Sequence, residues 1–280
     1  MKTKITILSE NTVDMPKNAI GEHGLAMLVE RDDATLFDTG QGFALMNNIK
    51  ALFKDQNQIK RVVLSHGHYD HTGGLKPLLE SLKRELPVFA HPDIFTSRIA
   101  RYDGPKGPID IPIGMPHNKK EYEDLGAKFI PVDGTEDITA GIRAFPAIPR
   151  IPEWKGFDER LKQKNGEAVT DDPFNDDLSL LLDTDSGPVV LLGCAHAGIV
   201  EILDHIAASA GLTEFHGVIG GTHLGSAPPE YLQKAIESLK KYRVKVVAAS
   251  HCTGFKAAAI LSNTFGEAYR PAAVGSVFEF

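Results

Sequence analysis

The sequence predicts one α/β domain, a four-layer αβ/βα sandwich in which two mixed β-sheets pack face to face between outer helices. Two observations carry this prediction. Short apolar segments typical of strands alternate with amphipathic segments typical of helices. A plan of two neighbouring strands followed by alternating helices and strands also occurs twice along the chain. At 280 residues the length suits one large α/β domain, so residues 1–280 are expected to form a single unit.

The first half supplies five expected strands and two expected helices. The strands are apolar runs, most of them β-branched or bounded by turn-forming residues. They are Ile5–Leu8, Leu25–Val29, Thr35–Phe37, Val62–Leu64 and Val88–Ala90. Two segments between them place leucine and isoleucine on one face at helical spacing. These helices are expected over Phe43–Phe53 and Lys76–Glu85.

The second half repeats the plan with a hairpin, a helix, a strand, a helix and a strand. The expected strands are Leu178–Leu182, Val189–Leu192, Gly217–Ile219 and Val244–Ala249. The clearest helices are Ile199–Ala210 and Pro229–Tyr242, and Phe255–Phe265 is expected to add another. Lys240 and Lys241 lie in the last turn of the second helix, where the helix dipole favours positive charge.

Residues 92–177 between the halves differ in composition. This stretch is rich in proline and contains the only tryptophan, Trp154. A long loop-rich insertion in a compact domain is commonly a lid or a binding loop. We therefore expect a lid-like insertion, the alternative being a solvated excursion without a role.

Composition excludes several functional classes. The formal net charge of −7 argues against a broad basic surface for nucleic acid or anionic membranes. Two cysteines, Cys194 and Cys252, exclude a disulfide scaffold. The N-terminal residues lack the apolar core of a signal peptide, and the longest apolar run is too short and polar to span a bilayer. We therefore expect a cytoplasmic protein that acts on a small molecule.

The strongest chemical signal follows the strand at 62–64. Three histidines and an aspartate, His66, His68, Asp70 and His71, occur within six residues. Imidazole and carboxylate are ligands for zinc and related divalent metals. His66 and His68 can converge on one ion while Asp70 and His71 point towards a second. Two ions about 4 Å apart can clamp an attacking and a leaving oxygen. A polar surface turn is the alternative, but it explains poorly why three histidines follow an apolar strand.

This His-x-His-x-Asp-His pattern closely resembles the signature of the metallo-β-lactamase fold superfamily. The segment Thr72-Gly73-Gly74-Leu75 resembles the turn that follows the signature in that superfamily. Asp38, in Leu36-Phe37-Asp38-Thr39-Gly40, resembles the aspartate that orients a metal-binding histidine there. The resemblance covers most of the chain and implies the four-layer fold and a divalent metal site, whereas the superfamily hosts many reactions.

A narrower resemblance concerns five further segments: Ser9–Asn11, Gly21–Leu25, Gly193–Ile199, Gly220–Leu224 and Ser250–Gly254. They look like the branch named for 7,8-dihydropterin-6-methyl-4-(β-D-ribofuranosyl)-aminobenzene-5′-phosphate synthase. That family joins an activated pterin to an aminoaryl ribose phosphate with loss of diphosphate. The resemblance therefore implies a pterin-like or phosphate-bearing substrate.

Two later histidines complete the expected ligand set. His196 and His251 each follow an expected strand, at the edge of the sheet where such sites form. For His196 the alternative is a histidine that caps the next helix. His251 resembles the last metal-binding histidine of the superfamily. We expect His66, His68 and His196 to hold a first ion and Asp70, His71 and His251 a second.

The chain also departs from the superfamily pattern. Most members carry a bridging aspartate in a Gly-Asp pair, where this chain has Gly193-Cys194. Cys194 is either a bridging thiolate, because a metal deprotonates a nearby thiol, or a buried structural cysteine. Asp177 lies where related proteins place their third histidine, so it is another candidate ligand.

The candidate catalytic groups are Asp70 and His223. His223 follows an expected strand in a glycine-rich turn, and it could instead contact substrate, bind metal or be structural. His23 and Trp154 are candidate substrate contacts, the latter as a stacking surface in the expected lid.

These observations predict an enzyme that uses one or two divalent metal ions, zinc first, with manganese, magnesium or iron as alternatives. It would hydrolyse a phosphoester, ester or lactone, or displace diphosphate on a pterin. A di-iron redox protein is the first alternative, although oxygen-reducing relatives resemble a pattern with glutamate where this chain has His68. A non-catalytic ligand sensor that retains a metal is the second.

Overall fold

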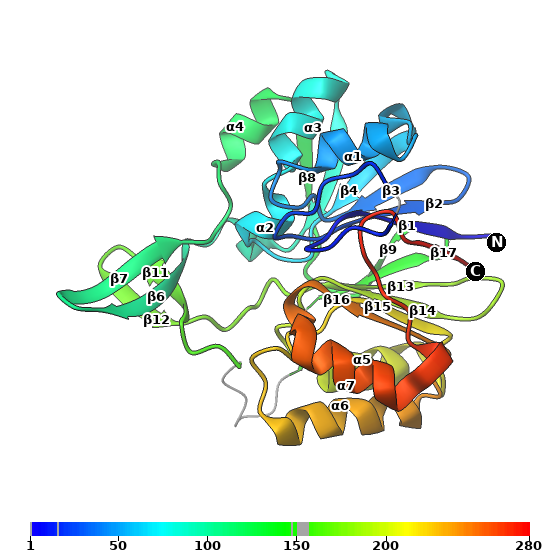
Figure 1. Ribbon diagram of the computed structural model, residues 1–280. Coiled ribbons are helices and arrows are strands. Elements are labelled where there is room, and N and C mark those ends of the chain that lie inside the picture. Colours follow the sequence, from blue (N-terminus) through cyan, green and yellow to red (C-terminus); the bar gives the residue numbers. More distant parts are fainter. Residues whose placement is uncertain (1, 16, 147, 150–156) are drawn as a thin grey trace.

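A computed structural model describes residues 2–15, 17–146, 148–149 and 157–280. Two large sheets lie face to face, and helices cover the outer face of each (Figure 1). A third, smaller sheet projects to one side of both. The expected four-layer αβ/βα sandwich is confirmed.

The first sheet has seven strands in the order β17-β1-β2-β3-β4-β5-β8. β17, β1, β2 and β3 pair antiparallel, and β3, β4, β5 and β8 pair parallel. Their bounds are β17 Val277–Glu279, β1 Lys4–Ser9, β2 Ala26–Glu30, β3 Ala34–Phe37, β4 Ile59–Val63, β5 Leu86–Ala90 and β8 Ala127–Pro131. The five strands expected in the first half all lie in this sheet.

The second sheet has six strands in the order β16-β15-β14-β13-β10-β9. The expected hairpin is present as antiparallel β13 and β14, and β14, β15 and β16 are parallel. The bounds are β16 Val246–Ser250, β15 Gly217–Gly221, β14 Val189–Leu192, β13 Ser179–Leu182, β10 Ile142–Phe145 and β9 Glu136–Thr139. The last expected strand begins two residues later than its apolar run, at Val246.

The layers pack on one another through three apolar clusters. The inner one joins the facing sides of the two sheets, for example Ile7 and Val63 from the first and Leu191 and Ile219 from the second. The outer clusters pack helices on each sheet, as amphipathic segments require. The helices are α1 Leu45–Ala51, α2 Tyr69–Thr72, α3 Leu75–Leu82, α4 Lys119–Asp124, α5 Ile199–Ala210, α6 Pro229–Lys241 and α7 Gly254–Phe265, with short 3-10 turns at Gln56–Gln58, Pro92–Phe95, His251–Thr253 and Gly266–Ala268.

Residues 92–177 supply strands to all three sheets. β8 extends the first sheet, and β9 and β10 extend the second. The third sheet, in the order β12-β11-β6-β7, is formed by two hairpins that project beside the sandwich (Figure 1). Its bounds are β12 Ala168–Asp171, β11 Leu161–Asn165, β6 Arg98–Gly104 and β7 Gly107–Pro112. Trp154 lies outside the described residues.

The described part of the chain contains no helix with the length and apolarity needed to cross a membrane.

Candidate metal centre

The signature histidines occupy the loop and short helix that follow β4. Asp38 follows β3, the neighbouring parallel strand, so both segments leave the sheet at the same edge. The Asp38 carboxylate accepts hydrogen bonds from the Ser65 backbone N–H at 2.7 Å and from Ser65 Oγ at 2.6 Å. His71 Nδ1 donates to the same carboxylate at 2.7 Å. Asp38 thereby fixes the His71 tautomer and turns Nε2 towards the centre, as expected for an orienting aspartate.

His66, His68 and His196 form the histidine group, whose ligand nitrogens all lie within 4.8 Å of one another. His66 Nε2 is 3.0 Å from His68 Nδ1. Two nitrogens bound to one tetrahedral zinc ion lie about 3.3 Å apart, from a Zn–N bond of about 2.0 Å. Burial lowers the pKa of all three imidazoles, that of His68 to about 3. The group is therefore neutral, as metal binding requires.

His23, Asp70 and His251 form the mixed group, again with ligand atoms within 4.8 Å. Asp70 Oδ2 lies 3.1 Å from His23 Nε2 and 3.3 Å from His251 Nε2. Burial favours a raised pKa for Asp70, but the imidazole of His71 and those of His23 and His251 hold it well below its usual range. His23 was expected only as a substrate contact, and its position beside Asp70 makes it a candidate ligand as well.

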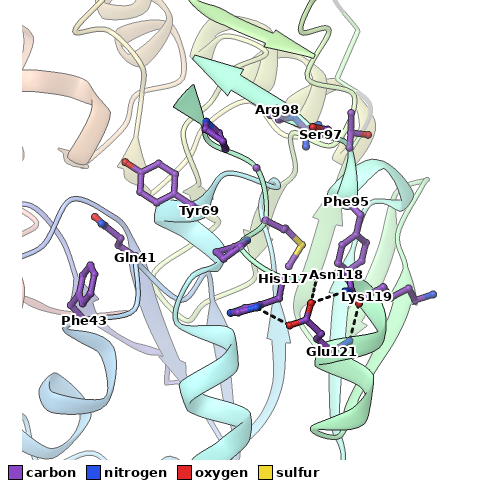
Figure 2. A pocket seen from close by; sticks show the side chains of 15 residues that line it. Gln41, Phe43, Tyr69, Phe95, Ser97, Arg98, His117, Asn118, Lys119 and Glu121 are labelled. Carbon is purple, nitrogen blue, oxygen red and sulfur yellow. Dashed lines mark hydrogen bonds and ion pairs between the residues drawn. The ribbon is translucent and has the colours of Figure 1, made fainter. Parts of the chain in front are cut away.

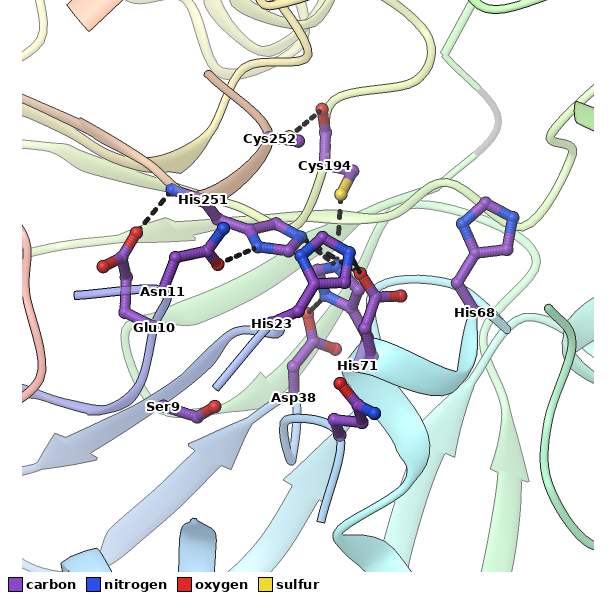
Figure 3. A network of polar contacts seen from close by, with 12 residues as sticks. Ser9, Glu10, Asn11, His23, Asp38, His68, His71, Cys194, His251 and Cys252 are labelled. Atoms are coloured by element: carbon purple, nitrogen blue, oxygen red, sulfur yellow. Dashed lines mark hydrogen bonds and ion pairs between the residues drawn. The ribbon is translucent and has the colours of Figure 1, made fainter. Parts of the chain in front are cut away.

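His71 and Cys194 lie between these two groups. His71 Nε2 is 3.1 Å from Cys194 Sγ and 3.3 Å from His251 Nε2. His66, His71 and Cys194 form a further candidate ligand set, the central group. Figure 3 shows the Cys194 sulfur directed towards His71, with His251 and His23 beside it. Both Cys194 and His196 therefore face the centre, and the thiol occupies its middle.

The donors at this centre fit one or two divalent metal ions. They are imidazoles, a carboxylate and a thiol, the ligands preferred by zinc and its neighbours. The 3.0 Å between His66 Nε2 and His68 Nδ1 is close to the spacing around one ion, so the residues present suit the metal that the sequence implies.

Other expected site residues lie nearby with different partners. Asp177 is buried and accepts a hydrogen bond from the Ala197 N–H at 2.7 Å, and it belongs to none of the ligand groups found among the described residues. This hydrogen bond holds in place the loop that contains His196. The His223 ring lies 4.5 Å from the His196 ring, centre to centre, and one of its nitrogens lies within 4.8 Å of both cysteine sulfurs.

Several positioning residues were missed by the sequence reasoning. Glu10 accepts a hydrogen bond from the His251 N–H at 2.8 Å, and Asn11 Oδ1 lies 2.9 Å from His251 Nδ1. Phe174 stacks on the His196 ring at 4.1 Å with an interplanar angle of 3°. The polar pair Glu10-Asn11 directly after an apolar strand was the available signal, because such residues face the same sheet edge as the histidines.

A cavity of about 800 Å³ borders the centre through Tyr69, the residue between His68 and Asp70. Figure 2 shows Phe43, Tyr69 and Phe95 among the side chains around it. None of the ligand groups lines this cavity. It is therefore a space beside the candidate centre, with aromatic walls and the size of a small-molecule site.

Replacing Asp38 with asparagine is expected to weaken metal binding about 10- to 100-fold, because the amide no longer holds the His71 imidazole through a charged hydrogen bond. Competition with a chromogenic chelator measures this affinity. Asp33→Asn is the matched control, because Asp33 is a partly exposed partner of Arg61. Equal affinities for both variants would contradict the orienting role.

Comparison with known proteins points to one family. A family model described as the metallo-beta-lactamase superfamily matches residues 20–251. The chain is 30% identical to the 7,8-dihydropterin-6-methyl-4-(beta-D-ribofuranosyl)-aminobenzene-5′-phosphate synthase of Methanocaldococcus jannaschii, over 99% of this chain and 96% of the relative. An uncharacterised protein of the same organism is 32% identical over 92% of this chain and 93% of its own length.

Among solved structures, Tm1679, described as a metal-dependent hydrolase of the beta-lactamase superfamily, is similar with a TM-score of 0.83 and 25% identity, over 99% of both chains. Zinc-bound PqqB of Methylobacterium extorquens shares the fold at a TM-score of 0.56 and 12% identity, over 99% of this chain and all of that one.

Proposed function

Because the chain belongs to the metallo-beta-lactamase superfamily, we propose that it is a metal-dependent transferase that joins a dihydropterin to an aminoaryl ribose phosphate. The observation that best supports a metal-dependent reaction is that the histidine group and the mixed group both lie beside His71. The named synthase, similar over 99% of this chain, supports the transferase reaction.

The proposed ligands are the histidine group for a first ion, and two residues of the mixed group together with His71 for a second. His66, His68 and His196 would hold a first ion, and Asp70, His71 and His251 a second, with zinc as the first choice. Cys194 would be a further thiolate ligand, because its sulfur lies 3.1 Å from His71 Nε2. Bound metal would supply a Lewis acid that polarises a phosphoryl or acyl oxygen. Asp38 would keep His71 oriented throughout.

Side chains of the protein would accept protons and bind the substrate. The Asp70 carboxylate, held ionised beside the His71, His23 and His251 imidazoles, would accept the proton of the attacking group. His23 is more than half exposed at its side chain, 3.1 Å from Asp70, so it would contact substrate as it enters. We propose that the aromatic cavity beside Tyr69 receives the ring system of the pterin and that the third sheet covers it.

A hydrolase of a phosphoester, ester or lactone is the second candidate. It is supported by Tm1679, which is described as a metal-dependent hydrolase and aligns over 99% of both chains. The two candidates share polarisation of an oxygen by metal and differ in the nucleophile, an aryl amine in one and water in the other.

The deciding experiment offers both chemistries to one preparation with defined metal content. We expect protein loaded with zinc to join a dihydropterin diphosphate to the aminoaryl ribose phosphate and to release diphosphate, and protein stripped by chelator to lose at least about 99% of that rate. Mass spectrometry of the product and a diphosphate assay measure the reaction.

Other outcomes would select the alternatives. Turnover confined to a panel of phosphodiesters, esters and lactones would select the hydrolase. An iron-loaded protein with a visible absorption band and oxygen consumption would select the di-iron redox protein. Tightly held metal without turnover on any of these substrates would select the sensor.

A further inference from the structure

A second ligand cluster lies beside the candidate centre, at the carboxyl ends of three neighbouring parallel strands. Cys194, His223 and Cys252 each follow the last residue of their strand, β14, β15 and β16 respectively, by two positions. Because these strands are parallel and adjacent, their carboxyl ends meet at one edge of the second sheet. The fold therefore brings together both cysteines of the chain and one histidine.

The ligand atoms of this thiol group, the two sulfurs and one imidazole nitrogen, all lie within 4.8 Å of one another. In a tetrahedral zinc site, two sulfurs lie about 3.8 Å apart, from a Zn–S bond of about 2.3 Å. Shifts of about 1 Å, which side-chain rotation supplies, would therefore complete a three-ligand site.

Local contacts hold the three residues in place. The His223 N–H donates a hydrogen bond to Cys252 Sγ at 3.2 Å. A Cβ atom at Gly221 would lie 2.7 Å from the Cys252 sulfur and 2.4 Å from the Gly193 carbonyl oxygen, so only glycine permits this approach. His223 itself has a left-handed backbone, with φ of +52°, which is unusual for a residue with a side chain and is concentrated at functional sites.

His223 supplies the observation that points to a ligand. Both of its ring nitrogens are buried without a well-formed hydrogen bond in the described part of the chain, and the side chain that interacts with the ring is the Cys252 thiol. A thiol is a weak hydrogen-bond partner, and a metal ion between the ring and the two thiols would satisfy the buried imidazole. Two thiols and an imidazole also form a softer donor set than either the histidine group or the mixed group.

We propose that Cys194, His223 and Cys252 bind a thiolate-coordinated divalent ion of the zinc type, adjoining the ions of the candidate centre. Cys194 is common to this group and the central group, so the proposed site adjoins the candidate centre at this residue. Each thiol releases its proton on binding. The assignment gives His223 a ligand role in place of the catalytic one expected from the sequence, and it holds whichever reaction the enzyme performs.

The test uses the full chain, purified without oxygen and loaded with Co²⁺. Thiolate ligands give Co²⁺ a near-ultraviolet charge-transfer band that grows with the number of bound sulfurs. We expect Cys252→Ser to halve this band and to remove one metal equivalent per chain, as measured by elemental analysis. His223→Ala should also remove one equivalent, whereas the control His205→Ala, a half-buried histidine of α5 packed near Phe145, should change neither.

A measurement on the wild-type chain covers a variant that fails to fold. Bound Zn²⁺ should slow alkylation of Cys252 by iodoacetamide at least tenfold, as read by mass spectrometry of the peptides. The proposal is overturned by equal alkylation rates with and without zinc, by a full band in Cys252→Ser, or by a Cys194–Cys252 disulfide in the anaerobic preparation. These readouts are independent of turnover, so a failed assay of the proposed reaction leaves them unaffected.

Discussion

Arg98→Ala is expected to lower the free energy of unfolding by about 3–5 kcal/mol, because it leaves two buried carboxylates without their cation. Arg98, at the start of β6, has a fully buried side chain. Its Nε donates to Asp172 at 2.7 Å and its Nη2 to Asp176 at 2.7 Å, and both carboxylates are also fully buried.

The same variant should weaken metal binding, because Asp176 also supports the signature loop. Its Oδ2 accepts a hydrogen bond at 2.7 Å from the backbone N–H of Gly67, which lies between His66 and His68. Loss of Arg98 frees Asp176 to move and loosens that loop, so we expect metal affinity to fall about 10-fold or more, as for other residues that support ligands.

Urea denaturation of metal-free protein measures the stability change without the contribution of bound metal. Arg101→Ala is the matched control on the same strand, because Arg101 pairs with Asp110 at the surface. That solvent-accessible pair is expected to contribute far less to stability than the buried network around Arg98. Equal losses for the two variants would show that the buried network around Arg98 does not stabilise the fold.

Site residues that lie close together in the sequence can be predicted from it more readily than residues whose contacts join distant segments. His66, His68, Asp70 and His71 lie within six residues, so their convergence follows from one turn after one strand. The positions of His196 and His251 beside the signature residues could also be predicted, because each follows an apolar strand and the carboxyl ends of parallel strands share an edge. Their role as ligands stays a prediction.

The residues that support the site were missed because their partners are far away in the sequence. Asn11 lies 240 positions from His251, and Arg98 lies 78 positions from Asp176. Neither pairing leaves a periodic or local pattern. Only the packing of the two sheets and the third sheet brings these groups together, and that packing is set by the whole chain.

The strands between residues 92 and 177 were missed for a related reason. β7, β11 and β12 are exposed or half-buried along most of their length, so their side chains lack the apolar pattern that identifies a buried strand. Prolines such as Pro108 and Pro112, which suit an edge strand, favoured a loop at the level of sequence. Backbone pairing in two hairpins, not burial, defines this sheet.

Replacing His68 with alanine is expected to lower turnover about 10³-fold and to remove one metal equivalent per chain. Removal of a ligand from the first ion takes away several kcal/mol of transition-state stabilisation, and each 1.36 kcal/mol corresponds to a factor of ten. The proposed ligands of the second ion, Asp70, His71 and His251, include no residue of the histidine group, so the second ion should stay bound. Elemental analysis and the rate with saturating substrate measure the two effects.

The matched control is His205→Ala, which truncates a half-buried histidine of α5 and should leave metal content and turnover within about twofold of the wild type. A His68→Ala protein with full metal content and wild-type turnover would remove His68 from the ligand set and, with it, the proposed function.

The choice of isostere tests the geometry more sharply than alanine does. Nδ1 of His68 lies 3.0 Å from Nε2 of His66. The side-chain oxygen of asparagine is attached to Cγ, the same carbon that carries Nδ1 in histidine. A glutamine oxygen lies one bond further out, nearer the position of Nε2. We therefore expect His68→Asn to retain the first ion with reduced affinity, whereas His68→Gln should lose it as alanine does. The reverse order would mean that His68 binds through Nε2, the buried nitrogen that faces away from His66, and would require a different position for the first ion.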